Sequence, residues 1–110
     1  MSELELVVQE GLVAAGLPAA VQQHPVTLPN GRTAYLDLAY VDPRVDIEID
    51  HSEWHATPSA VEQDKTRDLG LAVLGWERLR LTERSIERRL KVCIATICAV
   101  LDRRRPAGPG

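Results

Sequence analysis

The chain has 110 residues, of which 45% are hydrophobic and 26% are charged, which is enough for one compact domain and too little for two. Its 13 Lys and Arg against 16 Asp and Glu give a formal net charge of −3, which argues against a protein that binds nucleic acid through bulk positive charge. No run approaches the ~18 to 20 apolar residues of a membrane span, and the acidic start is unlike a secretory signal. We therefore expect a cytoplasmic protein without a membrane partner.

The N-terminal segment is predicted to be a helix. Ser2, followed three residues later by Glu5, is the pattern of a capping box, in which each side chain accepts a hydrogen bond from the other residue's backbone. Apolar residues recur at helical spacing until Gly16, a residue type that often ends helices. We therefore expect a helix from Ser2 to Ala15.

Three antiparallel strands are predicted next. The segment Val21 to Leu28 contains a proline and is expected to be an edge strand, because proline in a central strand forfeits a ladder hydrogen bond. The Asn-Gly turn at residues 29–32 favours a hairpin, so the strand Thr33 to Val41 should run antiparallel to its predecessor. After a second turn at residues 42–43, the segment Arg44 to Asp50 alternates apolar and acidic residues, which is typical of a strand.

A second helix and a fourth strand follow. The stretch Thr57-Pro58-Ser59, with Glu62 three residues after the serine, supplies a helix start, and this helix is expected to run to Leu74. The segment Trp76 to Leu81 is predicted to be a strand. Because it follows a crossover helix, this strand should return parallel to an earlier one and make the sheet mixed.

The last predicted element is a long helix. Thr82 is expected to cap it, and an apolar stripe extends to about Arg103. Cys93 and Cys98 would point about 140° apart on this helix, so we expect packing residues instead of a disulfide. Residues 104–110 are expected to form a flexible tail. The prediction is one α/β domain over residues 1–103, in the order α-β-β-β-α-β-α, with a four-stranded mixed sheet flanked by helices.

Acidic residues in the predicted strands are the most informative feature for function. Asp37 interrupts an apolar strand, and a lone buried carboxylate is costly enough to be neutralised or to bind a cation. Glu48 and Asp50 share a face of the next strand, which a short turn can bring beside Asp37. Two ionised carboxylates about 4 Å apart repel by about 4 kcal/mol at an effective dielectric of 20, so such a group favours a raised pKa or a hard cation such as Mg²⁺ or Mn²⁺. In the alternative interpretation, Asp46, Glu48 and Asp50 form the solvated face of a half-exposed strand.

Two further groups are candidates for a site. His55, with His51 as the second choice, suits a general acid or base beside such a cluster, although either fits a surface histidine equally well. The segment lacks the ligand context of a zinc site. On the predicted second helix, Asp68 lies on the sheet-facing stripe with Asp64 and Arg67 beside it, which fits a helix-surface network or phosphate binding.

The order of these residues resembles a nuclease family. The similarity rests on Asp37, Ile47-Glu48-Ile49-Asp50, Trp54-His55, Asp64-x-x-Arg67-Asp68 and the stretch Leu74-Gly75-Trp76-Glu77-Arg78-Leu79-Arg80. In that order they resemble the very-short-patch-repair endonuclease-like branch of the PD-(D/E)XK nuclease superfamily, and most of all the domain found C-terminal to AbiEi-type antitoxin helix-turn-helix domains. The likeness covers about residues 2–101 and implies a restriction-endonuclease-like fold.

The resemblance also implies roles for individual residues. Asp37 and Glu48 would bind Mg²⁺ or Mn²⁺, with the backbone carbonyl of Ile49 as a further ligand. Asp50 stands where the superfamily motif has lysine, so Asp50 or His55 would handle protons in catalysis. The residues expected to hold DNA phosphates are Arg67, Arg78 and Arg80.

Two functions from different classes are consistent with this sequence. The first is a metal-dependent endonuclease that hydrolyses DNA phosphodiesters. The second is a catalytically inactive nuclease-fold module that binds nucleic acid or protein in a toxin-antitoxin-type regulator, with a second copy of the chain or a helix-turn-helix domain as partner. The lysine missing at position 50 favours the second function, whereas the acidic cluster favours the first.

Overall fold

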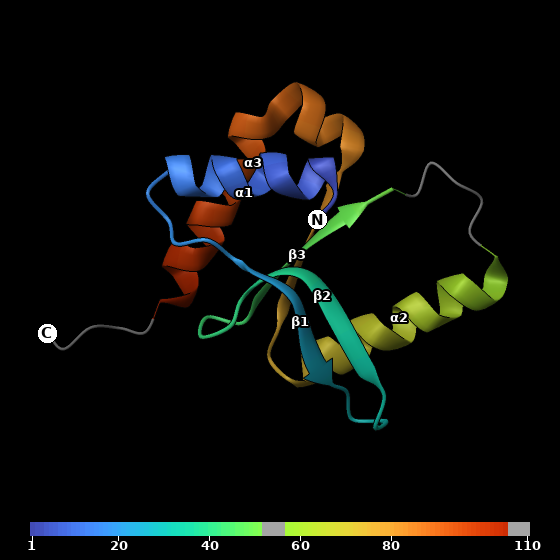
Figure 1. The fold of residues 1–110 in the computed structure, drawn as a ribbon. Coiled ribbons are helices and arrows are strands. Elements are labelled where there is room, and N and C mark those ends of the chain that lie inside the picture. The colour runs from blue at the N-terminus through green and yellow to red at the C-terminus, as the bar shows by residue number, and fades with distance from the viewer. Residues whose placement is uncertain (52–56, 106–110) are drawn as a thin grey trace, which may run out of the picture.

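The computed structural model describes residues 1–51 and 57–105 as three helices around a four-stranded sheet (Figure 1). In chain order the elements are α1 (Glu3–Ala14), β1 (Val21–Thr27), β2 (Thr33–Tyr40), β3 (Val45–Asp50), α2 (Pro58–Val73), β4 (Glu77–Thr82) and α3 (Glu83–Arg104). The predicted α/β class and the order α-β-β-β-α-β-α are confirmed.

The sheet has the strand order β1-β2-β3-β4 and is mixed, as predicted. The pairs β1–β2 and β2–β3 are antiparallel, and β4 joins β3 in parallel after the α2 crossover. Gly31 in the β1–β2 turn has φ +85°, a backbone conformation that glycine adopts at little cost. The strand β1, which contains a proline, is an edge strand, as predicted. Proline is tolerated there because one side of an edge strand has no neighbour to which an N–H group would donate.

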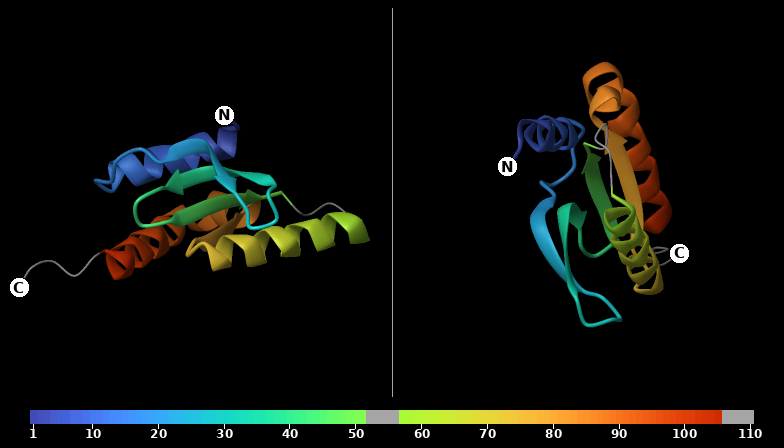
Figure 2. Two further views of the ribbon diagram at one scale, coloured as in Figure 1. Left: turned by 90° about the horizontal axis from the view of Figure 1, so that it is seen from below. Right: turned by 90° about the vertical axis from the view of Figure 1, so that its right-hand side faces the viewer.

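The two faces of the sheet differ in what covers them (Figures 1 and 2). Helices α1 and α3 pack on one face through an apolar core that includes Leu12, Leu38, Ile47 and Ile97, all fully buried. Helix α2 covers the other face and contributes one buried residue, Leu71. The N-terminal end of α2 projects past the end of β3, so this part of the helix has little sheet beneath it.

Local side-chain contacts start the helices. Ser2 and Glu5 form the predicted capping box, with backbone-to-side-chain hydrogen bonds of 3.0 and 3.2 Å. Helix α2 begins in the predicted stretch Thr57-Pro58-Ser59, and its N-cap is Thr57, whose hydroxyl accepts from the Ala60 N–H at 3.1 Å. Pro58 then occupies the first turn, where its missing N–H group loses no helical bond.

Helix α3 is not continuous. It bends at Arg89, which has non-helical backbone angles, and Ile86 before the bend and Ile94 after it both pack into the core. Cys93 packs there too, and both cysteines of the chain are free thiols, in line with a packing role. Arg104, placed in the predicted tail, belongs to α3 and donates to the Pro43 carbonyl at 2.6 Å. None of the described helices combines the length and apolar character needed to cross a bilayer.

A buried glutamine fastens α1 to the chain that leads into β1. The Gln9 amide donates to the Ala20 carbonyl at 2.7 Å and accepts from the Ala20 N–H at 2.8 Å. The side chain therefore pairs with Ala20 as a neighbouring strand would. Tyr40 makes a second link to the same segment, because its hydroxyl donates a hydrogen bond to the Pro18 carbonyl at 2.8 Å.

Replacing Gln9→Leu is expected to lower the free energy of unfolding by about 2 to 4 kcal/mol, because the buried N–H and C=O of Ala20 lose their partners. Urea unfolding followed by circular dichroism would measure the change. The matched control is Gln22→Leu on the exposed surface of β1, which should stay within about 0.5 kcal/mol of the wild type. Equal effects of the two substitutions would contradict the role given to Gln9.

Candidate active site

Strands β2 and β3 separate at two acidic residues. Their antiparallel pairing ends at Leu38 and Ile47, and the same register would next pair Asp37 with Glu48. Instead, the Asp37 N–H donates to Glu48 Oε2 at 3.1 Å, and the Ile49 N–H donates to Asp37 Oδ2 at 3.1 Å. Each carboxylate thus takes the place of a backbone carbonyl, and the two side chains are held between the strands.

The backbone on the other side of Asp37 is distorted as well. Gln23 lies opposite Asp37 in the β1–β2 register and has φ 48°, in the left-handed region. For a residue with a Cβ this conformation costs roughly 1 to 2 kcal/mol, and such strain is concentrated at functional sites. The irregularity at Asp37 therefore extends across three strands.

Asp37 and Glu48 also interact directly through their side chains. Burial is the main cause that raises the pKa of Glu48, and a side-chain hydrogen bond with Asp37 raises it further. Two adjacent negative charges repel, so a positive charge beside this pair is favourable. The structure therefore brings together the two residues expected to form the centre of the site.

Arg78 on β4 enters this acidic group from the next strand. Its side chain is only 13% exposed, and its Nη2 donates to Glu48 Oε1 at 2.6 Å. Nη1 forms an ion pair with Asp68 and approaches Asp64 Oδ1 at 3.5 Å, both on α2. Nε lies 3.3 Å from Asp46 Oδ2. One guanidinium therefore joins four carboxylates from two elements.

Arg80 extends this network along β4. It forms ion pairs with Asp64 and Asp68, so two arginines of β4 face two aspartates of α2. Asp68 thus lies on the side of α2 that faces the sheet, as predicted, and its carboxylate forms ion pairs with both arginines. These ion pairs connect α2 to the sheet in addition to the apolar cluster around Leu71, the one buried residue of the helix.

Asp46 is the most deeply buried acid of the site. It is 0% exposed, and among the described residues neither of its carboxylate oxygens has a hydrogen-bond partner. Burial, and next the charge of Glu48, raise the pKa of Asp46 to about 8, against an opposing effect of Arg78. The expectation of a solvated face made by Asp46, Glu48 and Asp50 is wrong, because α2 covers that face and Glu48 is only 7% exposed.

These residues form the wall of a cleft of about 640 Å³ between the sheet and α2. Seven of the residues expected to act in binding or catalysis line it, namely Asp37, Glu48, Ile49, Asp50, Arg67, Arg78 and Arg80. His51 is exposed at the end of β3, and His55 lies outside the described residues. Within residues 1–51 and 57–105, no group of three or more His, Cys, Asp or Glu is arranged to hold a metal ion.

The comparisons with known proteins give two relatives. These are the uncharacterized proteins MT2308 and Rv2248, from two strains of Mycobacterium tuberculosis. Each is 35% identical to the chain over 97 residues, which cover 88% of the chain and 36% of the relative. The chain thus spans about a third of the length of these relatives. No family model matches the chain, and no solved structure matches it.

Sequence reasoning missed the burial of Asp46 and the partners of Arg78. Asp46 entered the analysis only in the alternative of a solvated face, although it directly precedes the Ile47-Glu48-Ile49 stretch and shares its parity with Glu48. Arg78 was expected to bind phosphate, yet its guanidinium contacts carboxylates of the protein itself. The available signal was a parallel β4 beside β3, which places an alternating basic strand next to an alternating acidic one.

The raised pKa of Asp46 predicts a stability that falls as the pH rises. Between about 4, where the unfolded carboxyl titrates, and about 8, the folded state holds a proton that the unfolded state has released. In the presence of a chelator, the free energy of unfolding should therefore decrease from pH 5 to pH 8 by an amount on the order of a few kcal/mol, and the melting temperature should decrease with it. Thermal unfolding at several pH values measures this slope.

Asp46→Asn removes this titration, so it should make the pH profile shallower and raise the stability at pH 8 relative to the wild type. The raised pKa of Glu48 accounts for the slope that remains. Asp102→Asn, at an exposed position on α3, is the control and should leave the slope unchanged. If Asp46→Asn and wild type have the same slope, the Asp46 carboxyl is ionised in the native protein.

Proposed function

We propose that the chain is a metal-dependent phosphodiesterase domain that acts on DNA, related to the very-short-patch-repair endonuclease-like branch of the PD-(D/E)XK superfamily. The observation that carries the proposal is the contact of Asp37 with Glu48 where β2 and β3 separate, at the wall of an open cleft. Such a pair is unfavourable in a purely structural role, because the charge of Asp37 adds to the burial that raises the pKa of Glu48.

The donor set fits a hard divalent cation. Mg²⁺ is usually held by one or two carboxylates together with water and substrate phosphates, so two acids suffice for a site. Asp37, Glu48 and the carbonyl of Ile49 would hold Mg²⁺ or Mn²⁺. The Ile49 N–H points toward Asp37, and the C=O of a strand residue points to the same edge as its N–H.

Such an ion, when bound, polarises the scissile phosphate and lowers the pKa of a water molecule. The other roles belong to side chains of the cleft. Arg67 on α2 would hold a phosphate, because its guanidinium is outside the ion pairs found among the described residues. Asp50, or His55 beyond the described residues, would accept the proton of the attacking water.

Arg78 and Arg80 have a different part in this proposal from the phosphate contacts that the resemblance implies. Their guanidinium groups are bonded to carboxylates of β3 and α2. We propose that they position the acids and hold α2 at the correct distance from the sheet. They would thus act as positioning residues, and Arg67 as the contact to substrate.

Plasmid nicking tests the proposed activity. Wild-type protein with Mg²⁺ or Mn²⁺ should convert supercoiled DNA to the nicked form, and a chelator should abolish the reaction. Asp37→Asn and Glu48→Gln each keep an oxygen that can accept the backbone N–H, so the fold should persist, while the rate falls by about 100-fold or more.

The control for this experiment is Glu87→Gln, at an exposed position on α3, which should cleave like the wild type. Melting temperatures confirm that each variant is folded. Nicking that survives Asp37→Ala combined with Glu48→Ala would reject the assignment of these residues.

A specific contact favours the second candidate, a nuclease-fold module without catalysis. Glu48 is already paired with Arg78 at 2.6 Å, and Asp50 occupies the position of the superfamily lysine. In that case a guanidinium neutralises the acids permanently, and the cleft serves to bind DNA or a protein partner, including a second copy of the chain or a helix-turn-helix domain. In either function we propose that the protein acts in the cytoplasm.

Calorimetric titration with Mn²⁺ separates the two candidates. Binding in the millimolar range or tighter that is lost in Asp37→Asn supports the metal-dependent enzyme. Absence of binding heat and of any thermal shift, in a protein that still binds DNA or self-associates, supports the non-catalytic module.

A further inference from the structure

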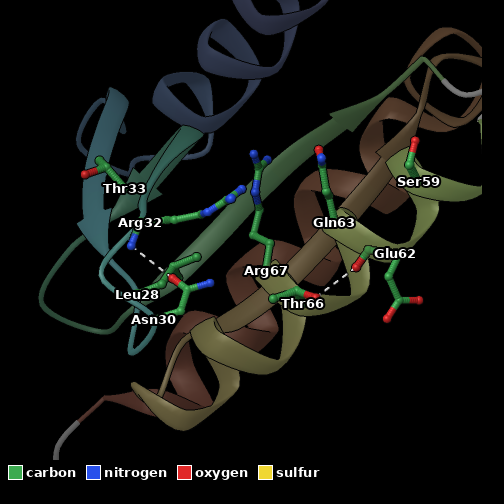
Figure 3. Close-up of a pocket in the computed structure, with 9 residues that line it drawn as sticks. All are labelled: Leu28, Asn30, Arg32, Thr33, Ser59, Glu62, Gln63, Thr66 and Arg67. Atoms are coloured by element: carbon green, nitrogen blue, oxygen red, sulfur yellow. Dashed lines mark hydrogen bonds between the residues drawn. The ribbon is translucent and has the colours of Figure 1, made fainter.

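A second groove lies beside the acidic cleft, between the β1–β2 turn and α2 (Figure 3). It has a volume of about 540 Å³ and is lined mainly by polar side chains. Those used in the argument are Asn30, Arg32, Gln63, Thr66 and Arg67. Arg67 lines both this groove and the acidic cleft, so the two hollows adjoin at one side chain.

The groove has two arginines from opposite walls. Arg32 follows the glycine of the β1–β2 turn, and Arg67 lies in the middle of α2; in Figure 3 their side chains extend toward each other. Neither guanidinium takes part in the ion pairs found within residues 1–51 and 57–105. This contrasts with Arg78 and Arg80, which are both neutralised by carboxylates of the protein.

The acid that lines this groove does not neutralise the arginines. Glu62 directs its carboxylate away from them in Figure 3, and its backbone carbonyl accepts from the Thr66 hydroxyl at 3.0 Å. The acids of the adjoining cleft act on Arg67 from one side, but neither arginine has an ion-pair partner among the described residues of the groove. Two guanidinium groups that converge repel each other, and an anion placed between them would relieve that repulsion. Binding of a negatively charged ligand in this groove is therefore electrostatically favourable.

The surrounding donors indicate a phosphate group. Arginine forms bidentate hydrogen bonds with phosphate oxygens, and the amides of Asn30 and Gln63 supply neutral donors beside it. Since the whole chain carries a net charge of −3, a diffuse attraction for polyanions is not expected. Binding of an anion here depends on these particular side chains.

We infer that this groove binds a backbone phosphate of a DNA strand, next to the phosphate that lies in the acidic cleft. The inference rests on the proposed function, and it adds Arg32 and the β1–β2 turn to the substrate contacts. Arg67 stands between the two phosphates and fixes their spacing. The strand would run from the acidic cleft along α2 to the turn.

Fluorescence anisotropy with a labelled DNA oligonucleotide, in the presence of a chelator, tests the groove independently of cleavage. Arg32→Gln should weaken binding about tenfold, the size of one lost charge-assisted contact, and make the slope of log affinity against log salt shallower by about one. The matched control Arg88→Gln, on the exposed surface of α3, should bind like the wild type. Equal affinities of Arg32→Gln and Arg88→Gln would overturn the inference.

A neutral methylphosphonate moved along the oligonucleotide identifies the phosphate concerned. At one position it should weaken binding by the wild type and have no further effect on Arg32→Gln. Additive losses at every position would overturn the inference. If this coupling is found while Asp37→Asn cleaves normally, the phosphate groove is supported and the proposed catalytic site is rejected. If Asp37→Asn is inactive and the coupling is missing, the catalytic site is supported and the phosphate groove is rejected.

Discussion

The ion-pair network around Arg78 is the constraint on which the rest of the site depends. Its guanidinium reaches carboxylates of β3 and of α2, and so it compensates buried acids and holds a helix at the same time. Without this cation the face of β3 that carries Asp46 and Glu48 would bring unpaired negative charge under α2, which is strongly unfavourable in a protein interior. The position of α2, and with it the shape of the cleft, follows from this balance of charge.

The two faces of the sheet divide stability from chemistry. The face under α1 and α3 is closed by branched aliphatic side chains and supplies the apolar burial that a domain of this size needs. The side under α2 has a smaller apolar cluster around Leu71, and beside it the ion pairs of α2 and β4 line an open cleft. Acids with raised pKa values are retained there because the opposite face stabilises the fold.

The contact between Glu48 and Arg78 bears on both candidate functions. For an enzyme it keeps the glutamate oriented beside Asp37 and allows a divalent ion to share its charge. For a binding module the same contact replaces the ion altogether. The second groove adds a different element, because its arginines have no such partner among the described residues and are available to an external anion.

The sequence by itself determined the order of the elements and the meeting of Asp37 with Glu48. Period-two alternation, the Asn-Gly turn and the capping residues are local signals, and a short turn between adjacent strands fixes which side chains are neighbours. Only the tertiary structure decided that Asp46 is buried, because an alternating strand looks the same whether water or a helix covers its polar face. It also decided that Arg78 pairs with the acids and that Arg32 and Arg67 line one groove, since both arrangements depend on where α2 packs against the sheet.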